Sequence, residues 1–328
     1  MSSRLRLVAA TAVATGLLLL APALPAGAAP LRDAVAPGAS KGAGCVPGTA
    51  GAARVTRPAD GPAYTDAQRR SIDRALRQRL ARQGLAPTKS RAGARVGATL
   101  RIPVHVHVIG GKSSKGASKK RVRNQLRILD SAYNGAQSST NTTTRFDFYL
   151  ASFDRTRKSA WRSAVIGGRD DLRMRRALHR GGPSALNLYV SRPQSPGAGT
   201  VLGWATPPHQ ARKASHLDGV VIHEESLPRG RFRGYNRGDT AVHEVGHWLG
   251  LFHTFEGGCE GPGDMVDDTP AQSEASSACD ELKDSCLAQP GTDPVHNFMD
   301  YSVDDCMNSF TPGQVARMQD NWLAYRTP

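Results

Sequence analysis

Hydrophobic and polar residues alternate over several short stretches of the chain, which is the pattern of strands that bury one face. The alternation is strict from Arg101 to Ile109, and it returns from Phe146 to Phe153. His105 and His107 share the face opposite the apolar one. There they are expected to lie over a packed or polar surface rather than bind a metal. Three shorter apolar runs complete the expected strands: Leu186–Val190, Val201–Thr206 and Gly219–Glu224.

Apolar residues spaced three and four apart predict helices beside these strands. Ser118 is placed to cap one that runs to about Asn134, and Thr311-Pro312 opens another that runs to about Tyr325. Two more are expected nearer the N-terminus and in the middle of the chain, at Thr65–Arg82 and Arg169–His179.

One helix carries side chains that packing alone does not explain, in the run TAVHEVGHWLGLFHTF. His243 and His247 lie one helical turn apart on one face, so two imidazoles can hold one metal ion. Gly250 has no Cβ and lets the chain leave the helix sharply, which can bring His253 back as a third ligand. Three protein ligands with one open position are typical of catalytic zinc, whereas structural zinc sites are closed.

Glu244 follows the first histidine directly, where its carboxylate reaches the water on the metal rather than the metal itself. That position suits a general base. The helix is expected to begin with Asp239 or Thr240 as its cap. Its apolar residues also fit a buried core helix, but a core helix needs neither the three histidines nor the glutamate.

Two other classes of function stay open at this point. One is a zinc-binding module without catalysis, such as an adhesion or inhibitor-like domain, which has no need of Glu244. The other is a basic protein that binds anionic surfaces and carries the motif incidentally.

The N-terminus has the pattern of a secretory signal. Arg4 and Arg6 precede an apolar run from Leu7 to Leu24, and Ala26-Gly27-Ala28 fits a cleavage site. The run is also compatible with a membrane anchor, but the small residues at its end favour cleavage. No other stretch is long and apolar enough to span a bilayer. We therefore expect residues 1–28 to be removed, and the protein to be secreted without stable membrane association.

Residues 29–95 differ from the rest in being rich in Ala, Gly, Pro and Arg. Apart from one helix, with Ile72, Ala75, Leu76 and Leu80 on its apolar face, they offer little that could form a core. They are interpreted as a pro-segment, the alternative being an extension that stays. Cys45 within it would keep the enzyme latent by occupying the open zinc position, or it is a spare thiol.

Charge is unevenly distributed. The chain has a net charge of +15, and residues 1–95 hold 15 basic and 4 acidic residues. Residues 96–237 carry +17 and residues 238–328 carry −13. Much of the excess lies in the part expected to be lost, and no nucleic-acid motif accompanies it, so a nucleic-acid partner is not expected. An acidic wall beside a cleft would favour cationic substrate side chains.

Residues 256–297 have no regular pattern and are rich in Gly, Asp, Pro and Cys. A loop of this length needs cross-links, and four of the five cysteines lie in the last third of the chain: Cys259, Cys279, Cys286 and Cys306. They predict two disulfides, and their spacing leaves all three pairings open. Residues 263–270, reading GDMVDDTP, gather carboxylate and hydroxyl oxygens that suit calcium or, equally well, a hydrogen-bonded turn.

The extended zinc motif resembles that of metzincin metalloproteases, and NFMDY stands where their methionine turn is expected. Within that clan the chain resembles the pappalysin (M43) family through IPVHVHVI, LGWAT, HEVGHWLGLFHTF, GDMVDDTP, NFMDYS and DDCMNSFTPGQVARM. These motifs span residues 100 to 320. The resemblance implies an α+β, two-lobed metzincin-like domain over residues 96–328. Its mostly parallel sheet and helices would lie over the zinc helix, with an irregular, disulfide-bonded C-terminal lobe.

The resemblance also implies roles for single residues. His243, His247 and His253 would bind zinc, Glu244 would be the base, Met299 would form the floor under the metal and Tyr301 would stabilise the oxyanion. It implies the pairs Cys259–Cys286 and Cys279–Cys306, calcium at Asp264, Asp268 and Thr269, and a latency thiol at Cys45. The sequence therefore predicts a secreted, monomeric zinc endopeptidase that acts on proteins or peptides and is made as a latent zymogen.

Overall fold

The computed structural model describes residues 64–88, 98–196 and 199–327. These all fall in one of the two units into which the chain divides, residues 52–328. The signal sequence, most of the proposed pro-segment and Cys45 lie outside the described residues.

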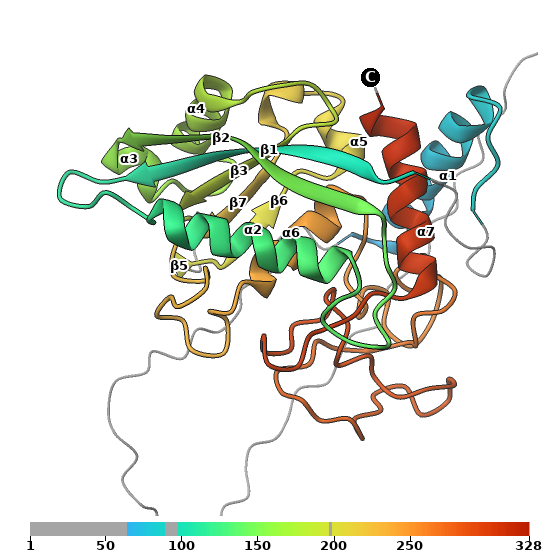
Figure 1. Cartoon of the computed structure of the whole chain (residues 1–328). Helices are drawn as coiled ribbons and strands as arrows, with labels where there is room; N and C mark the ends of the chain where they lie inside the picture. Colours follow the sequence, from blue (N-terminus) through green and yellow to red (C-terminus); the bar gives the residue numbers. More distant parts are fainter. Residues whose placement is uncertain (1–63, 89–97, 197–198, 328) are drawn as a thin grey trace, which may run out of the picture. The chain divides into compact units, whose positions relative to one another are not determined.

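A five-stranded sheet in the order β2-β1-β3-β7-β6 forms the frame of this unit (Figure 1). The first four strands run parallel, and β6 pairs antiparallel to β7 at the edge. The central strands β3 and β7 are buried on both faces, as is usual in parallel sheets, and the order agrees with the expected mostly parallel sheet. The strands are β1 (Leu100–Gly110), β2 (Phe146–Arg157), β3 (Leu186–Ser191), β6 (Gly203–Ala205) and β7 (Val220–His223).

The principal core lies between the sheet and two helices, α2 (Lys119–Tyr133) and α6 (Asp239–Trp248), which Figure 1 shows on the same side of the sheet. The alternate apolar residues of β1 all point into it and are fully buried, beside Leu129 of α2 and Val242 and Val245 of α6. Burying that face against α2 and α6 fixes the zinc helix beneath the sheet.

The other face of the sheet is covered as well, by α3 (Ser159–Arg162) and α4 (Arg169–Leu178). Trp161 and Met174 from these helices pack with Ile109 and Tyr189 of the sheet. His107 is fully buried on this face, and its ring nitrogens lie 2.8 Å from Asp154 and 3.1 Å from Asn187. His107 thus belongs to a structural network away from the zinc helix.

The segment between Leu249 and Thr311 contains no helix and no strand of the sheet. This agrees with the irregular loop that the sequence predicts. Two disulfides cross-link this lobe, Cys259–Cys286 and Cys279–Cys306, which is the pairing that the resemblance implies. The chain then enters α7 (Pro312–Asn321), capped by Thr311, and ends in the π-helical turn η2 (Trp322–Arg326).

Helix α1 (Asp66–Arg82) packs against α7 and η2 (Figure 1). Thr65 and Gln68 form a capping box at its start. Leu76 and Leu80 are buried against Ala324 as expected, whereas Ala75 is exposed. Arg69 and Asp73 take the remaining buried positions, because the surface that α1 covers offers them ionic partners.

Several local expectations were wrong. Neither Asp239 nor Thr240 caps α6: Gly238 takes that position with a φ of 113°, and the Asp304 carboxylate accepts from the backbone N–H groups of Arg237 and Gly238. No side chain caps α6, and a carboxylate that holds the preceding turn from a distant segment leaves no local sequence signal. The short segments β4 (Gln194–Ser195), β5 (Gly199–Thr200), α5 (Pro208–Ala211) and η1 (Ser215–Leu217) were not expected either.

Candidate active site

Helix α6 places His243 and His247 on one face, with their ring centroids 4.7 Å apart. The helix ends at Trp248, and Gly250 then adopts a φ of 95°, which L side chains rarely reach. A Cβ on Gly250 would also collide with the side chain of Asn321. A glycine is therefore needed here both for the turn and for the packing of α7, and the turn returns the chain so that His253 faces the helix.

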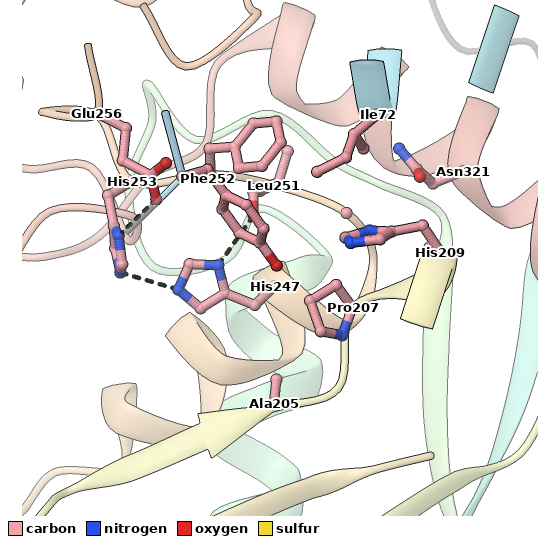
Figure 2. A pocket seen from close by; sticks show the side chains of 12 residues that line it. Ile72, Ala205, Pro207, His209, His247, Leu251, Phe252, His253, Glu256 and Asn321 are labelled. Carbon is pink, nitrogen blue, oxygen red and sulfur yellow. Dashed lines mark hydrogen bonds and ion pairs between the residues drawn. The ribbon is translucent and has the colours of Figure 1, made fainter. Parts of the chain in front are cut away.

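The three histidines converge through their Nε2 atoms. His247 Nε2 lies 3.1 Å from His243 Nε2 and 3.0 Å from His253 Nε2 (Figure 2 shows His247 and His253). Four ligands at about 2.05 Å around a tetrahedral zinc would lie about 3.3 Å from one another. These two distances are close to those of a zinc site, and all three nitrogens lie within 4.8 Å of one another.

The partners of the other ring nitrogens fix the tautomers. Nδ1 of His243 lies 2.6 Å from the carbonyl oxygen of Phe298, and Nδ1 of His247 lies 2.9 Å from that of Leu251. Nδ1 of His253 lies 3.0 Å from the Glu256 carboxylate. Because each Nδ1 donates its proton to one of these oxygens, the three Nε2 atoms present lone pairs to the same point. A cation satisfies that arrangement, and the donor set fits zinc.

Met299 and Tyr301 lie beneath and beside this cluster. Met299 is fully buried, and Gly246 leaves the room for its sulfur, since a Cβ at position 246 would collide with it. The Tyr301 hydroxyl lies 3.2 Å from His253 Nε2. The structure thus brings both residues of the methionine turn to the histidine cluster.

Glu244 is fully buried beside the cluster, under the edge strand β6. A Cβ built on Gly203 would lie 2.8 Å from a carboxylate oxygen of Glu244. Glu244 therefore lies against the edge strand of the sheet, on the helix that carries two of the three histidines.

Comparisons with known proteins agree with this geometry. The M43 peptidase family, described as pregnancy-associated plasma protein-A, matches residues 183–323. An extracellular metalloprotease of Pyricularia oryzae is 42% identical over 231 residues, which is 69% of this chain and 76% of the relative. One of Neurospora crassa is 40% identical over 235 residues, covering 70% and 77% of the two chains.

Solved structures give the same result. Mature mirolysin of Tannerella forsythia, in complex with a cleaved peptide, is 27% identical with a TM-score of 0.57, and the match covers 71% of this chain and 100% of mirolysin. A promirolysin mutant is 26% identical with a TM-score of 0.61, covering 82% and 99%.

The chain belongs to the pappalysin (M43) family of metzincin metalloproteases. This membership makes it a zinc metalloendopeptidase and an extracellular one, and it decides against the non-catalytic zinc module and the surface-binding protein. Among the described residues, no helix is long and apolar enough to cross a membrane.

The acidic stretch of this chain, residues 263–270, is partly committed to hydrogen bonds. Asp268 accepts from the Thr311 hydroxyl at 2.7 Å and from the Gly313 N–H at 2.8 Å, and so holds the start of α7. Asp264 accepts from the N–H of Val266 and is 3% exposed. Burial raises the pKa of Asp264 to about 7. Calcium binding by Asp264, Asp268 and Thr269 stays a prediction.

One residue at the site was not found from the sequence. Glu256 is buried behind His253 and orients it, and Arg69 of α1 lies 3.5 Å from its other oxygen (Figure 2 shows Glu256 with His253). The spacing of Glu256 from His253 is not distinctive by itself. Only the rule that a zinc-bound imidazole needs an acceptor for its Nδ1 proton could have indicated Glu256 from the sequence.

Proposed function

We propose that this extracellular zinc endopeptidase cleaves peptide bonds with Glu244 as its general base and is made as a latent zymogen. The catalytic role of Glu244 is supported by the convergence of three histidine Nε2 atoms beside its buried carboxylate. His243, His247 and His253 would hold the zinc, which when bound supplies a Lewis acid for the scissile carbonyl and lowers the pKa of water.

Side chains and backbone of the protein would bind the substrate, transfer the proton and stabilise the oxyanion. An extended substrate pairs with the edge strand β6, which places a peptide carbonyl above the zinc helix. Glu244 accepts the proton of the attacking water at its carboxylate and passes it to the leaving amine nitrogen. The Tyr301 hydroxyl, beside His253, donates a hydrogen bond to the oxyanion. Met299 packs below and keeps the histidines in place.

Latency is supported by where α1 lies. The helix belongs to the proposed pro-segment, residues 29–95, and its Arg69 reaches Glu256 behind a proposed zinc ligand. The promirolysin match also extends over more of this chain than the mature mirolysin match, 82% against 71%. Residues 96–328 would then be the mature, monomeric enzyme, after removal of the signal sequence at 1–28.

The test is casein hydrolysis by Glu244→Ala, with zinc content measured on the same samples. We expect one bound zinc per chain and turnover lower by about 10²–10⁴-fold, because proton transfer is lost while the histidines remain. Glu260→Ala, an exposed glutamate in the following loop, is the matched control and should keep full activity. Normal turnover by Glu244→Ala would refute its role.

A further inference from the structure

A pocket beside His247 and His253 is the feature that the mechanism leaves unexplained. The space left open in it is only about 30 Å³, because Tyr64 and Ile72 form part of its lining, and its other walls include Pro207, Leu251 and Phe252. His209 faces it from α5 (Figure 2). Burial lowers the pKa of His209 to about 4, so this ring is neutral at pH 7. The pocket is thus mainly apolar and adjoins the proposed zinc ligands.

Tyr64, just before α1, already contacts one wall of this pocket. Its ring meets Phe252 edge-on, with centroids 5.5 Å apart, and His209 at 5.9 Å. The Gln210 side chain donates a hydrogen bond of 3.0 Å to the Tyr64 hydroxyl. Edge-on packing on two rings with a hydrogen bond at the far end is how proteins recognise a tyrosine side chain.

Arg69 holds Tyr64 in that position. It is 2% exposed, donates to the Tyr64 carbonyl oxygen, and pairs with Asp66 and with Glu256. Glu256 in turn orients His253. The tyrosine is therefore tied through one buried guanidinium to the carboxylate behind a zinc ligand.

The rest of α1 fixes this arrangement to the C-terminal helix. Asp73 and Arg317 form a buried ion pair of 3.0 Å, and Arg79 donates to the carbonyl oxygen of Ala324. Beyond the helix, Thr88 donates to the Asp320 carboxylate through its N–H and its hydroxyl. With α1 held along its whole length, Tyr64 has a high effective concentration at the pocket.

We propose that the wall formed by Phe252, His209 and Gln210 is a subsite for an aromatic substrate side chain, which Tyr64 occupies in the intact chain as a tethered competitor. This rests on the proposed function as a peptidase. The charged group in the pocket wall, Glu256, is engaged by Arg69 and His253. An aromatic preference here is therefore separate from any preference for cationic side chains elsewhere in the cleft.

Binding tests the subsite independently of turnover. The protein is the full-length chain carrying Glu244→Gln, which prevents self-cleavage. It is titrated into fluorescein-labelled hexapeptides that carry Tyr, Phe, Leu or Ala at one position. That position is moved along the peptide from one set to the next. Adding Tyr64→Ala should strengthen binding of the Tyr and Phe peptides at least fivefold at one position, and that of the Ala peptide less than twofold. Arg74→Ala, exposed on the same helix, is the control and should change none.

Gln210→Ala separates the hydroxyl contact from the ring contact. In the Tyr64→Ala background it should weaken the Tyr peptide about threefold or more and leave the Phe peptide unchanged, since Gln210 is exposed and contacts the hydroxyl. The same peptides are then assayed for cleavage by protein with Glu244 intact and residues 1–95 removed, because the intact chain is proposed to be latent.

The outcomes are distinct. Equal gains for Tyr and Ala peptides, or no gain with Tyr64→Ala while its melting temperature is unchanged, would overturn the subsite. Selective binding without cleavage of any peptide would keep the subsite and reject the proposed peptidase mechanism. Cleavage without selective binding of the Tyr and Phe peptides would keep the peptidase mechanism and reject the aromatic subsite.

Discussion

Gly203 of β6 lies so close to Glu244 of α6 that the edge strand and the carboxylate leave no room for a side chain between them. A Cβ at position 203 would sit 2.8 Å from both Cγ and an oxygen of Glu244. Real Cβ contacts are essentially never this short, so one of the two groups would have to move. The strand that is proposed to bind substrate therefore also limits where the proposed base can be.

Gly203→Ala should impair catalysis without affecting the metal site. The added methyl displaces the Glu244 carboxylate or the strand by a fraction of an ångström to an ångström, and misplacement of that size can cost on the order of 100-fold in rate. The expected result is a fall in kcat/KM of that order on a quenched fluorescent peptide, with zinc content unchanged.

Gly182→Ala is the control for this substitution, because a Cβ there meets nothing within 4 Å. It should keep normal kinetics. A Gly203→Ala enzyme with unaltered kcat/KM would show that Glu244 does not need its present position.

The sequence predicted the zinc helix and the sheet because their signals are local. Periodicity marked β1 and α2, and a five-residue pattern placed His243, Glu244, His247 and His253 on a helix and its turn. The resemblance added the disulfide pairing, which spacing left open. These features depend on residues close in the chain or on a family pattern.

What the sequence did not predict depends on contacts between distant segments. Asp304 holds the turn before α6 from 66 residues away, through the N–H of Gly238, and Arg69 reaches Glu256 across 187 residues. Gly203 has no side chain to signal its place above Glu244. Such contacts arise only once the sheet, α6 and α1 are assembled, so no window of the sequence contains them.

Glu256→Gln should weaken zinc binding. The Glu256 carboxylate accepts from Nδ1 of His253, and this makes Nε2 a stronger donor to the metal. A neutral amide is a weaker acceptor, so zinc affinity should fall about 10–100-fold, the usual effect of removing such a partner. Competition with a chromogenic chelator measures this affinity without relying on activity.

Glu260→Gln removes a charge from the same loop at an exposed position and should leave zinc affinity unchanged. If both variants bound zinc as the wild type does, Glu256 would not be a supporting residue of the metal site.

Asp264 should make stability depend on pH in a direction opposite to that of most carboxylates. Burial raises its pKa to about 7 in the folded chain, whereas an unfolded aspartate has a pKa near 3.9. Between these values the folded state holds a proton that the unfolded state has lost. Stability therefore falls as pH rises from about 4 to about 7, and the loss is complete above that range.

Asp264→Asn removes this titration, so in the presence of chelator its melting temperature should decline less than that of the wild type between pH 5 and pH 8. Each pKa unit corresponds to about 1.4 kcal/mol, or roughly 3–5 °C for a domain of this size. Asp267→Asn, at the exposed position nearby, should follow the wild type. Identical slopes for all three proteins would contradict the raised pKa.

Calcium adds a second readout to the same experiment. A cation at Asp264, Asp268 and Thr269 binds the ionised carboxylate, so excess calcium should raise the melting temperature of the wild type more at pH 8 than at pH 5. It should act weakly on Asp264→Asn at either pH, because the amide brings no charge to the site. A calcium effect that is equal in the two proteins would place the ion elsewhere. If calcium changed the melting temperature of neither protein, no metal would compete with the proton on Asp264. The acidic stretch would then serve only as the turn that holds the start of α7.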